Sequence, residues 1–302
     1  MELAMIGLGK MGLNMATRLV RGGHRVVGYD PSAESVAAAS RNGVEAGGSL
    51  EEGLGKLKAP RVAWLMVPSG AITDDSVNRL ATLLGTGDCL IDGGNSNYKD
   101  TLRHAAVLQT RGIDFLDAGT SGGIWGLDEG YSLMIGGNAA TVERLRPIFE
   151  TLAPAKDRGW GRVGPSGAGH FVKMIHNGIE YGMMQALAEG FDIMRAKQEF
   201  GLDLSGVAEI WRYGSVVRSW LLDLTARVLS VDQTLADVEP WVADSGEGRW
   251  TVTEAMDHDV PAPVISMALQ MRFVSRDTEN FAARLVAEMR NQFGGHAIKK
   301  AQ

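Results

Sequence analysis

Five polar side chains of different chemistry recur at helical spacing in the second half of the sequence. They are Lys173, His176, Asn177, Glu180 and Tyr181, at positions i, i+3, i+4, i+7 and i+8. Residues with this spacing share one face of an α-helix, and apolar side chains fill the remaining faces of this segment. Lysine, glutamate and imidazole can exchange protons, while the amide and the phenol can hold a ligand. The stripe indicates acid–base chemistry, although a solvated helix face has the same spacing.

A glycine-rich turn follows an apolar run at residues 3–6 and precedes a helical pattern at 11–21. The residues of the turn are Gly7, Leu8, Gly9, Lys10, Met11 and Gly12. In a dinucleotide-binding turn, the first glycine permits the bend and the second lets the backbone approach the pyrophosphate. The third lets helix and strand pack closely, and the helix N-terminus attracts the anion. We therefore predict a cofactor site here; a purely structural turn is the alternative.

Asp30 ends the second expected strand, at residues 25–29. A carboxylate at this point accepts hydrogen bonds from the ribose hydroxyls of the adenosine and repels a 2′-phosphate. No arginine follows it, since the next residues are Pro31 and Ser32. The sequence thus predicts NAD rather than NADP, unless Asp30 is only a solvated residue at a strand end.

Short apolar runs and amphipathic stretches alternate through the first half of the chain. The strand-like runs lie at 3–6, 25–29, 61–67, 89–91 and 113–116, and the helical patterns between them at 11–21, 70–84 and 98–111. This alternation predicts a parallel sheet covered on both faces. Together with the glycine-rich turn, it indicates an α/β Rossmann-type domain over residues 1–165.

Long helical periodicities replace this pattern after residue 165. They cover residues 168–200, 204–229 and 263–293, with prolines at the start and glycines at the end of the last one. We therefore predict an all-helical domain over residues 166–302.

Composition excludes several classes of function. The 302 residues carry a net charge of −6, which argues against nucleic acid as a partner. Cys89 is the single cysteine and the six histidines show no ligand spacing, so no metal site is predicted. There is no apolar stretch of about 18 residues that would span a membrane. We expect a cytoplasmic protein.

These motifs together resemble those of the decarboxylating 6-phosphogluconate dehydrogenases, of the short NAD-preferring type within the β-hydroxyacid dehydrogenase superfamily. The resemblance covers essentially the whole chain. It rests on Gly7–Gly12, Asp92–Ser96, Gly119–Gly123, Lys173–Tyr181, Arg249–Thr251, Arg272 and Arg290–His296. The superfamily shares the first three motifs and the lysine. His176, Glu180, Tyr181 and the Arg290–His296 tail point to a phosphorylated sugar acid as substrate.

The resemblance implies a mechanism. Lys173, as a neutral amine, takes the proton of the substrate 3-hydroxyl while C3 delivers hydride to the nicotinamide. A lysine near other cations in a closed site can have its pKa lowered enough for this. The 3-keto acid then loses its carboxylate while protonated Lys173 polarises the ketone. Glu180 protonates C1 of the enediol, and ribulose 5-phosphate is released.

The resemblance also implies binding roles. The catalytic residues are Lys173, Glu180, Asn95 and His176. The cofactor-binding residues are Gly7, Leu8, Gly9, Lys10, Met11, Gly12, Asp30, Val67 and Asn95. The substrate-binding residues are Asn95, Ser121, Gly122, Gly123, His176, Asn177, Tyr181, Arg249, Thr251, Arg272, Arg290 and His296. Arginine suits the phosphate because its planar guanidinium donates two parallel hydrogen bonds.

The chain departs from the longer members in three places. It ends soon after Arg290 and His296, whose equivalents in the family reach into a neighbouring subunit. We therefore expect a homodimer or homotetramer with shared active sites. Longer members usually have lysine where Arg249 stands. Near the substrate loop, Asn97 replaces a common glutamate and residues 124–126 replace an acidic run.

Three other functions compete with this interpretation. Another β-hydroxyacid dehydrogenase, acting on an unphosphorylated acid such as 3-hydroxyisobutyrate, would not need Glu180, Arg272, Arg290 or His296. A silent NAD-sensing module would have no reason to keep Lys173 together with Glu180. A metal-dependent decarboxylase is disfavoured because no ligand spacing is present.

Overall fold

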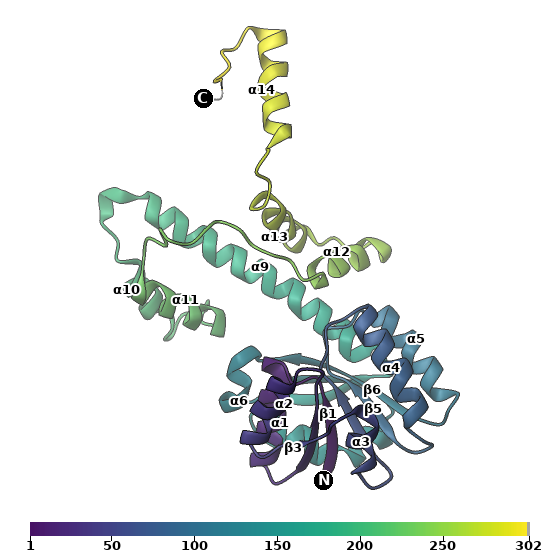
Figure 1. The fold of residues 1–302 in the computed structure, drawn as a ribbon. Helices are drawn as coiled ribbons and strands as arrows, with labels where there is room; N and C mark the ends of the chain where they lie inside the picture. Colours follow the sequence, from purple (N-terminus) through teal and green to yellow (C-terminus); the bar gives the residue numbers. More distant parts are fainter. Residues whose placement is uncertain (301–302) are drawn as a thin grey trace. The chain divides into compact units, whose positions relative to one another are not determined.

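The computed structural model describes residues 1–300 of the chain (Figure 1). The chain divides into two compact units, Met1–Asn177 and Gly178–Gln302. The division falls inside a single helix, α9 (Ala168–Ala196). The boundary expected at residues 165 and 166 lies just before this helix begins.

The first unit is an eight-stranded sheet in the order β3-β2-β1-β4-β5-β6-β7-β8. Its strands are β1 (Glu2–Ile6), β2 (Arg25–Tyr29), β3 (Glu45–Ala46), β4 (Val62–Leu65), β5 (Cys89–Asp92), β6 (Asp114–Ser121), β7 (Ser132–Gly137) and β8 (Trp160–Gly164). The first six strands follow the order of dinucleotide-binding domains, with the crossover between β1 and β4. The predicted α/β class is therefore confirmed.

The pairing of β6 with β7 is antiparallel, whereas every other pair in the sheet is parallel. The alternation of strands and helices predicted a wholly parallel sheet, which is wrong at this point. An antiparallel neighbour needs no long crossover. Only η1 (Gly123–Trp125) and α6 (Gly126–Glu129) separate the two strands. Strands β3, β7 and β8 were not predicted from the sequence; β3 has only two residues, and β7 and β8 are rich in glycine.

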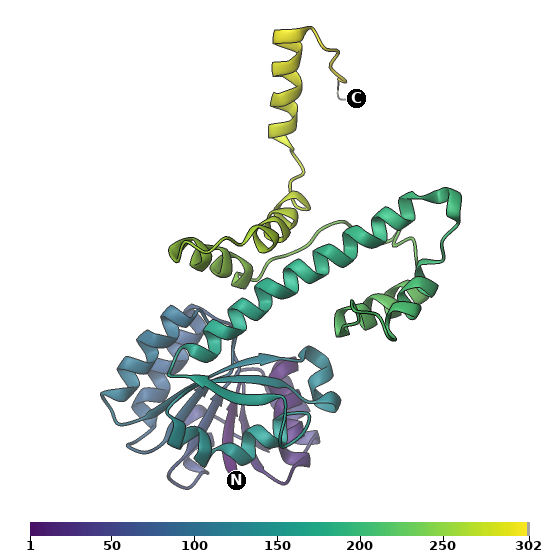
Figure 2. The same cartoon turned by 180° about the vertical axis from the view of Figure 1, so that it is seen from behind.

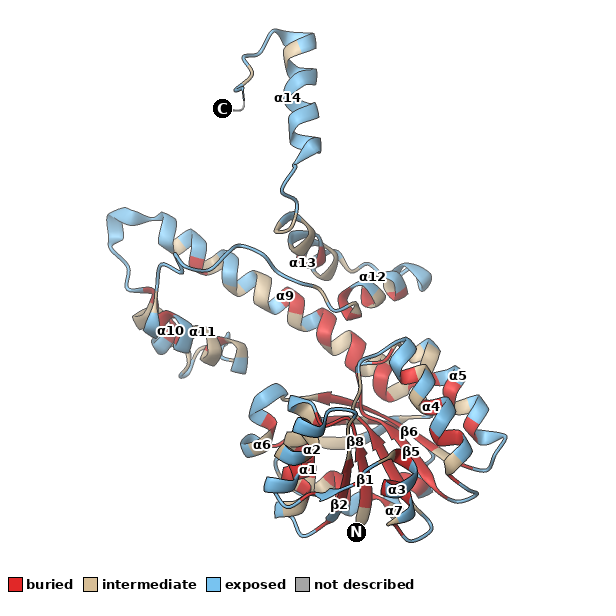
Figure 3. Cartoon of the chain, viewed as in Figure 1, coloured by how far each residue is buried: buried red, intermediate tan, exposed pale blue. Residues whose placement is uncertain are grey.

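Alternate residues of the central strands enter two different cores. In β1, Leu3 and Met5 join one core while Ala4 and Ile6 join the other. Helices cover both faces of the sheet (Figure 1, Figure 2). One face packs against α1 (Lys10–Arg21), α2 (Ala33–Arg41), α7 (Ala139–Arg144) and α8 (Arg146–Leu152). The other packs against α3 (Leu50–Gly55), α4 (Ala71–Leu83) and α5 (Tyr98–Gln109). The central strands are buried on both faces, as Figure 3 shows, and the carboxyl ends of the parallel ones form one edge.

The second unit is helical, as predicted. After α9 come η2 (Gln198–Phe200), α10 (Leu204–Trp211), α11 (Trp220–Val231), α12 (Glu247–Asp257), α13 (Pro263–Val274) and α14 (Phe281–Gly294). One small core forms between α9, α10 and α11, and another surrounds Tyr181 with residues of α12 and α13. Within the described residues, no helix is long and apolar enough to cross a membrane.

Two helices predicted as continuous are broken in the structure. The pattern at 204–229 is interrupted after α10, where Gly214 has a φ of 71° and the Ser219 side chain caps α11. The pattern at 263–293 is interrupted after α13, where Asp277 accepts hydrogen bonds from the backbone of Glu279 and Asn280. The helical periodicity of the sequence continues across both breaks, but local hydrogen bonds of the side chains to the backbone end one helix and begin the next there. Helix α12 was not predicted from the sequence.

Candidate active site

The glycine-rich turn leaves open space at one glycine and none at the other two. A Cβ added to Gly7, whose φ is 93°, would collide with the carbonyl of Met66, and one on Gly12 would collide with the carbonyl of Gly7. A Cβ on Gly9 would meet no heavy atom within 4 Å. The first and third glycines therefore serve the fold, whereas the second leaves the backbone accessible to a ligand.

The N-terminus of α1 lies directly after this open glycine. No side chain caps the helix, and no acidic residue stands in its first turn. Uncapped N–H groups and the positive end of the helix dipole form a site for an anionic group. The turn thus fits the pyrophosphate of a dinucleotide.

Asp30 lies at the end of β2 and binds the turn itself. Its Oδ2 accepts a hydrogen bond from the backbone N–H of Leu8 at 2.7 Å, and its Oδ1 accepts one from Ser32 at 2.8 Å. A carboxylate has about four acceptor positions, so capacity remains for ribose hydroxyls. Val67 follows β4 and lies against Gly7. Asp30 and Val67, both predicted for the cofactor, therefore lie against the glycine-rich turn.

Lys173 is buried on α9, with 6% of its surface exposed. Its Nζ lies 2.6 Å from Oδ1 of Asn177 and 3.3 Å from Nδ1 of His176. The same ring nitrogen of His176 lies 3.2 Å from Oδ1 of Asn177. Three of the five residues of the predicted stripe thus form one hydrogen-bonded cluster, which fixes the position of the amine.

Asp117 of β6 joins the start of α9 to the sheet. This carboxylate is fully buried, and it accepts hydrogen bonds from the backbone N–H groups of Gly167 at 2.7 Å and His170 at 2.9 Å. It satisfies helix donors that would otherwise be unpaired, and its negative charge lies at the positive end of the helix. The cap places α9 against β6, whose last residue is Ser121.

Glycines allow β6 and α9 to approach closely. A Cβ on Gly119 would lie 3.2 Å from Cγ of Lys173 and closer still to its Cβ, and one on Gly169 would collide with the carbonyl of Asp117. Lys173 therefore lies beside the end of β6, where Gly122 and Gly123 have φ values of 133° and 51°. These backbone conformations favour glycine and turn the chain away after Ser121.

Replacing Gly119 with alanine is expected to push α9 away from β6 and lower both stability and activity. Overpacking of this kind costs about 1–3 kcal/mol of unfolding free energy. Thermal melting and kcat would be measured against Gly161→Ala in β8, where an added Cβ meets no atom within 4 Å. If Gly119→Ala and Gly161→Ala behaved alike, the close approach would not control Lys173.

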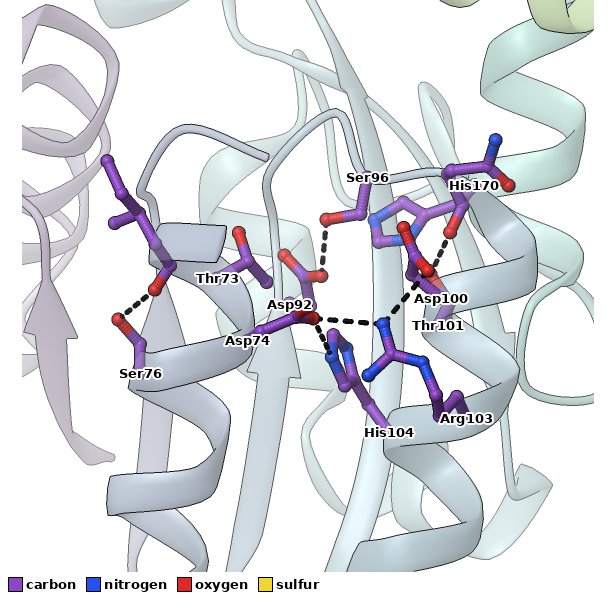
Figure 4. A network of polar contacts seen from close by, with 12 residues as sticks. Thr73, Asp74, Ser76, Asp92, Ser96, Asp100, Thr101, Arg103, His104 and His170 are labelled. Atoms are coloured by element: carbon purple, nitrogen blue, oxygen red, sulfur yellow. Dashed lines mark hydrogen bonds and ion pairs between the residues drawn. The ribbon is translucent and has the colours of Figure 1, made fainter. Parts of the chain in front are cut away.

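Asn95 is exposed in the loop that follows β5. Beneath it, buried Asp92 accepts hydrogen bonds from the Gly94 N–H at 3.0 Å and the Ser96 hydroxyl at 2.7 Å. Nearby, Thr101 Oγ1 lies 2.7 Å from Nδ1 of His170, which links α5 to the start of α9 (Figure 4). The Asp92 carboxylate thus holds the loop that presents Asn95.

A second cluster forms around Tyr181 in the helical unit. The guanidinium carbon of Arg272 lies 3.4 Å from the centre of the Tyr181 ring, and its Nη1 donates to the Ala243 carbonyl at 2.7 Å. The Tyr181 hydroxyl accepts a hydrogen bond from the Ser245 N–H at 3.4 Å. Two residues predicted to bind phosphate are therefore in contact.

Arg249 belongs to the same cluster. Its Nε and Nη2 donate to the two carboxylate oxygens of Asp244 at 2.8 and 3.2 Å, and its guanidinium lies 4.4 Å from the centre of the Phe273 ring. A lysine could not make this two-point contact. Thr251 is buried near the middle of α12, against Gly178, and its hydroxyl donates a hydrogen bond to the Glu247 carbonyl at 2.8 Å.

Arg290 and His296 lie apart from this cluster. No residue of helix α14 is buried, and Figure 3 colours nearly the whole helix as exposed. Within the described residues, no hydrogen bond or ring contact joins Arg290 or His296 to Arg249 or Arg272. The backbone carbonyl of His296 instead accepts a hydrogen bond from the Asn291 side-chain amide at 2.9 Å.

Comparison with known proteins gives a consistent match along the chain. A model of the NAD binding domain of 6-phosphogluconate dehydrogenase matches residues 2–161, and one of the 6-phosphogluconate dehydrogenase C-terminal domain matches residues 169–301. The NAD(+)-dependent, decarboxylating 6-phosphogluconate dehydrogenase of Haloferax volcanii is 41% identical over 301 residues, 99% of both chains. The chain belongs to the 6-phosphogluconate dehydrogenase family.

Family members differ in length. The decarboxylating 6-phosphogluconate dehydrogenase of Homo sapiens is 36% identical over an alignment of 290 residues, and the match covers 91% of this chain but 59% of the human protein. Among solved structures, the 6-phosphogluconate dehydrogenase of Plasmodium falciparum superposes with a TM-score of 0.84 at 28% identity, covering 100% of this chain and 67% of that one. This chain thus spans about three fifths to two thirds of the length of these two relatives.

Several positioning residues of this family member escaped the sequence analysis. Asp117 lies 50 residues before the helix N–H groups that it caps, and Asp244 lies five residues before the arginine that it binds. Arg276 also contacts Asp244, at 2.7 Å. An acid shortly before a motif arginine was the available signal for Asp244; no local pattern marked Asp117.

Proposed function

We propose that this protein oxidatively decarboxylates 6-phosphogluconate to ribulose 5-phosphate and CO2 with NAD as oxidant. The observation that carries the proposal is the buried Lys173 amine, held by His176 and Asn177 beside the end of β6. Membership of the 6-phosphogluconate dehydrogenase family supports the substrate, and the arginines around Tyr181 offer a site for its phosphate.

Lys173 is the proton acceptor for the oxidation. As a neutral amine, its Nζ takes the proton from the 3-hydroxyl while the bond from C3 to its hydrogen breaks. When bound, NAD accepts the hydride that leaves C3. His176 and Asn177 restrict the amine to one position, which lowers the entropic cost of reaching the reactive geometry.

Proton return completes the reaction. The bond between C1 and C2 breaks, CO2 leaves, and the electron pair becomes the double bond of an enediol while Lys173 Nζ returns its proton to the C3 oxygen. Glu180 then donates a proton to the carbon that lost the carboxylate, while the neutral Lys173 Nζ takes the proton of the C3 hydroxyl back, which gives the ketose. Lys173 and Glu180 are seven residues apart on α9, about 10 Å along the helix axis, a distance that a sugar acid can bridge.

The remaining predicted residues hold the substrate. Ser121, Gly122 and Gly123 donate hydrogen bonds to the carboxylate end, and Asn95 lies between nicotinamide and substrate. Tyr181, Arg249, Thr251 and Arg272 receive the phosphate, because guanidinium groups bind phosphate oxygens in pairs.

The tail is assigned to the active site of a neighbouring subunit in a homodimer or homotetramer. Arg290 lies on α14, whose apolar residues Phe281, Leu285, Met289 and Phe293 recur every four positions and are 46–80% exposed. A helix with an exposed apolar stripe normally packs against another surface. A second copy of this chain would cover the stripe and gain Arg290 and His296 for its own site.

Initial rates of reduced-nicotinamide formation test the function. With 6-phosphogluconate, turnover is expected with NAD, and one CO2 should form for each cofactor reduced. Rates with NADP are measured separately on the same preparation. If the folded protein binds NAD but does not turn over 6-phosphogluconate with either NAD or NADP, the proposed substrate is wrong. That result would favour an unphosphorylated hydroxy acid as substrate.

Asp30 is expected to set the cofactor preference. Asp30→Asn keeps an acceptor for the Leu8 N–H but removes the charge that repels a 2′-phosphate. The ratio of kcat/KM for NAD to that for NADP should fall about tenfold, equivalent to about 1.4 kcal/mol. Glu143→Gln, at an exposed ion pair on α7, is the control. An unchanged ratio in Asp30→Asn would show that preference is set elsewhere.

A further inference from the structure

Asp244 is a buried carboxylate between two guanidinium groups. Its side chain is 4% exposed, and it binds Arg249 through both oxygens and Arg276 through Oδ2, at 2.7 Å from Nη2. The guanidinium of Arg249, with that of Arg276, holds the pKa of the Asp244 carboxyl below its usual range, although burial acts in the opposite direction. Asp244 is therefore an anion shared by two arginines.

Arg276 lies just beyond α13, four residues after Arg272. Its Nε donates to the Arg272 carbonyl at 3.1 Å, and its guanidinium lies 5.6 Å from the centre of the Phe273 ring. Arg249 lies over the same ring. Arg276 is thus fixed beside two arginines already assigned to the phosphate, although no sequence motif included it.

Residues 243–245 connect this whole cluster. The Ala243 carbonyl accepts from Arg272, the Asp244 carboxylate accepts from Arg249 and Arg276, and the Ser245 N–H donates to Tyr181. Three adjacent residues therefore orient the predicted phosphate-binding side chains from α9, α12 and α13.

The charges of the cluster suit a phosphate monoester. Three guanidinium groups and one carboxylate leave a net charge of about +2, and a phosphate monoester carries about −1.5 to −2 at neutral pH. Guanidinium groups this close repel one another, and the Asp244 carboxylate offsets that repulsion. The Arg276 guanidinium donates two of its five N–H groups to the Arg272 carbonyl and the Asp244 carboxylate, so the other three could bind phosphate oxygens.

We propose that Arg276 is a further residue that binds the substrate phosphate, and that Asp244 is the positioning residue that holds Arg249 and Arg276 together for it. The proposal rests on the function proposed above. It adds a third arginine from the same chain to the phosphate site and explains why Asp244 is buried there.

The test compares competitive inhibitors that differ in the phosphate group. Inorganic phosphate and gluconate are each titrated against 6-phosphogluconate in wild type, Arg276→Gln and Asp244→Asn. The matched control is Arg195→Gln, which removes an exposed arginine paired with Asp192 on α9. We expect Arg276→Gln to raise both the KM for 6-phosphogluconate and the Ki for phosphate about tenfold, the loss of one charge-assisted hydrogen bond. The Ki for gluconate should stay within twofold.

Asp244→Asn should also raise the KM for 6-phosphogluconate and the Ki for phosphate. In the double variant with Arg276→Gln, the fold-change of each constant should be smaller than the product of the two single fold-changes. Unchanged KM and phosphate Ki in Arg276→Gln would overturn the proposal, as would equal losses for phosphate and gluconate, which indicate a general structural role. If Asp244→Asn does not fold, Arg276→Gln alone decides, because its side chain is 26% exposed.

Failure of the proposed function gives a different result. If wild type does not turn over 6-phosphogluconate, thermal stabilisation by inorganic phosphate replaces the kinetics. Stabilisation that is lost in Arg276→Gln but kept in Arg195→Gln would still support the phosphate cluster. Stabilisation equal in both variants would overturn it.

Discussion

Replacing Lys173 with methionine is expected to abolish turnover, with a loss in kcat of about 10⁴-fold, at the upper end for acid–base groups. The loss is large because the same amine takes a proton during oxidation, returns it during decarboxylation and takes it again when the enediol becomes the ketose. Methionine has nearly the same length and no charge, so the buried position beside Asn177 stays filled. The binding constant for NAD should change less than threefold, since Lys173 lies outside the glycine-rich turn.

Lys173→Arg separates charge from proton transfer. Arginine keeps a cation near Asn177, but its guanidinium does not lose a proton at any pH the protein survives. The Lys173→Arg variant should therefore be as inactive as Lys173→Met, even if it binds 6-phosphogluconate. Single-turnover kinetics and calorimetric titration of NAD are the measurements. An arginine variant that retained a tenth of the wild-type kcat would contradict a proton-accepting role for Lys173.

The parts of this site that follow from local geometry could be predicted from the sequence. Helical spacing places Lys173, His176 and Asn177 on one face, and the structure joins them by hydrogen bonds. The glycine-rich turn and Asp30 likewise lie within one strand–turn–helix unit and its neighbouring strand. Short-range rules of this kind depend on backbone geometry, which varies little between proteins.

The parts that depend on distant contacts could not be predicted in the same way. The cap of α9 by Asp117 joins residues 50 apart, and no local pattern in the sequence marked this aspartate. Arg276 contacts Asp244, 32 residues before it, and lies at the break after α13 that the helical periodicity of the sequence did not predict. The reversed strand β7 also depends on pairing with β6 rather than on its own sequence. In each case, tertiary contacts decided among several arrangements that local preference allowed.

Mixing two inactive variants is expected to restore activity if the tail completes a neighbour's site. Lys173→Met lacks the base but has an intact tail, whereas Arg290→Ala combined with His296→Ala has the base but a defective tail. Alone, the tail variant should lose about 10²-fold or more in kcat/KM, because two contacts to the phosphate are removed, one of them from a guanidinium. Its stability should not change, since no residue of α14 is buried within its own chain. The two variants therefore carry complementary defects.

In a mixed dimer, one site combines an intact Lys173 with an intact tail from the other chain, and the second site lacks both. Random association of equal amounts gives half mixed dimers, so about a quarter of wild-type activity should return. Coexpression with two different affinity tags isolates the mixed species, and each variant coexpressed with itself is the control. If the tail instead served its own chain, every site would still lack either Lys173 or the tail, and the mixture would show only the average of the two variants. Activity therefore returns only if the tail of one chain completes the active site of the other. The fraction of wild-type activity that returns distinguishes a shared active site from one formed by a single chain.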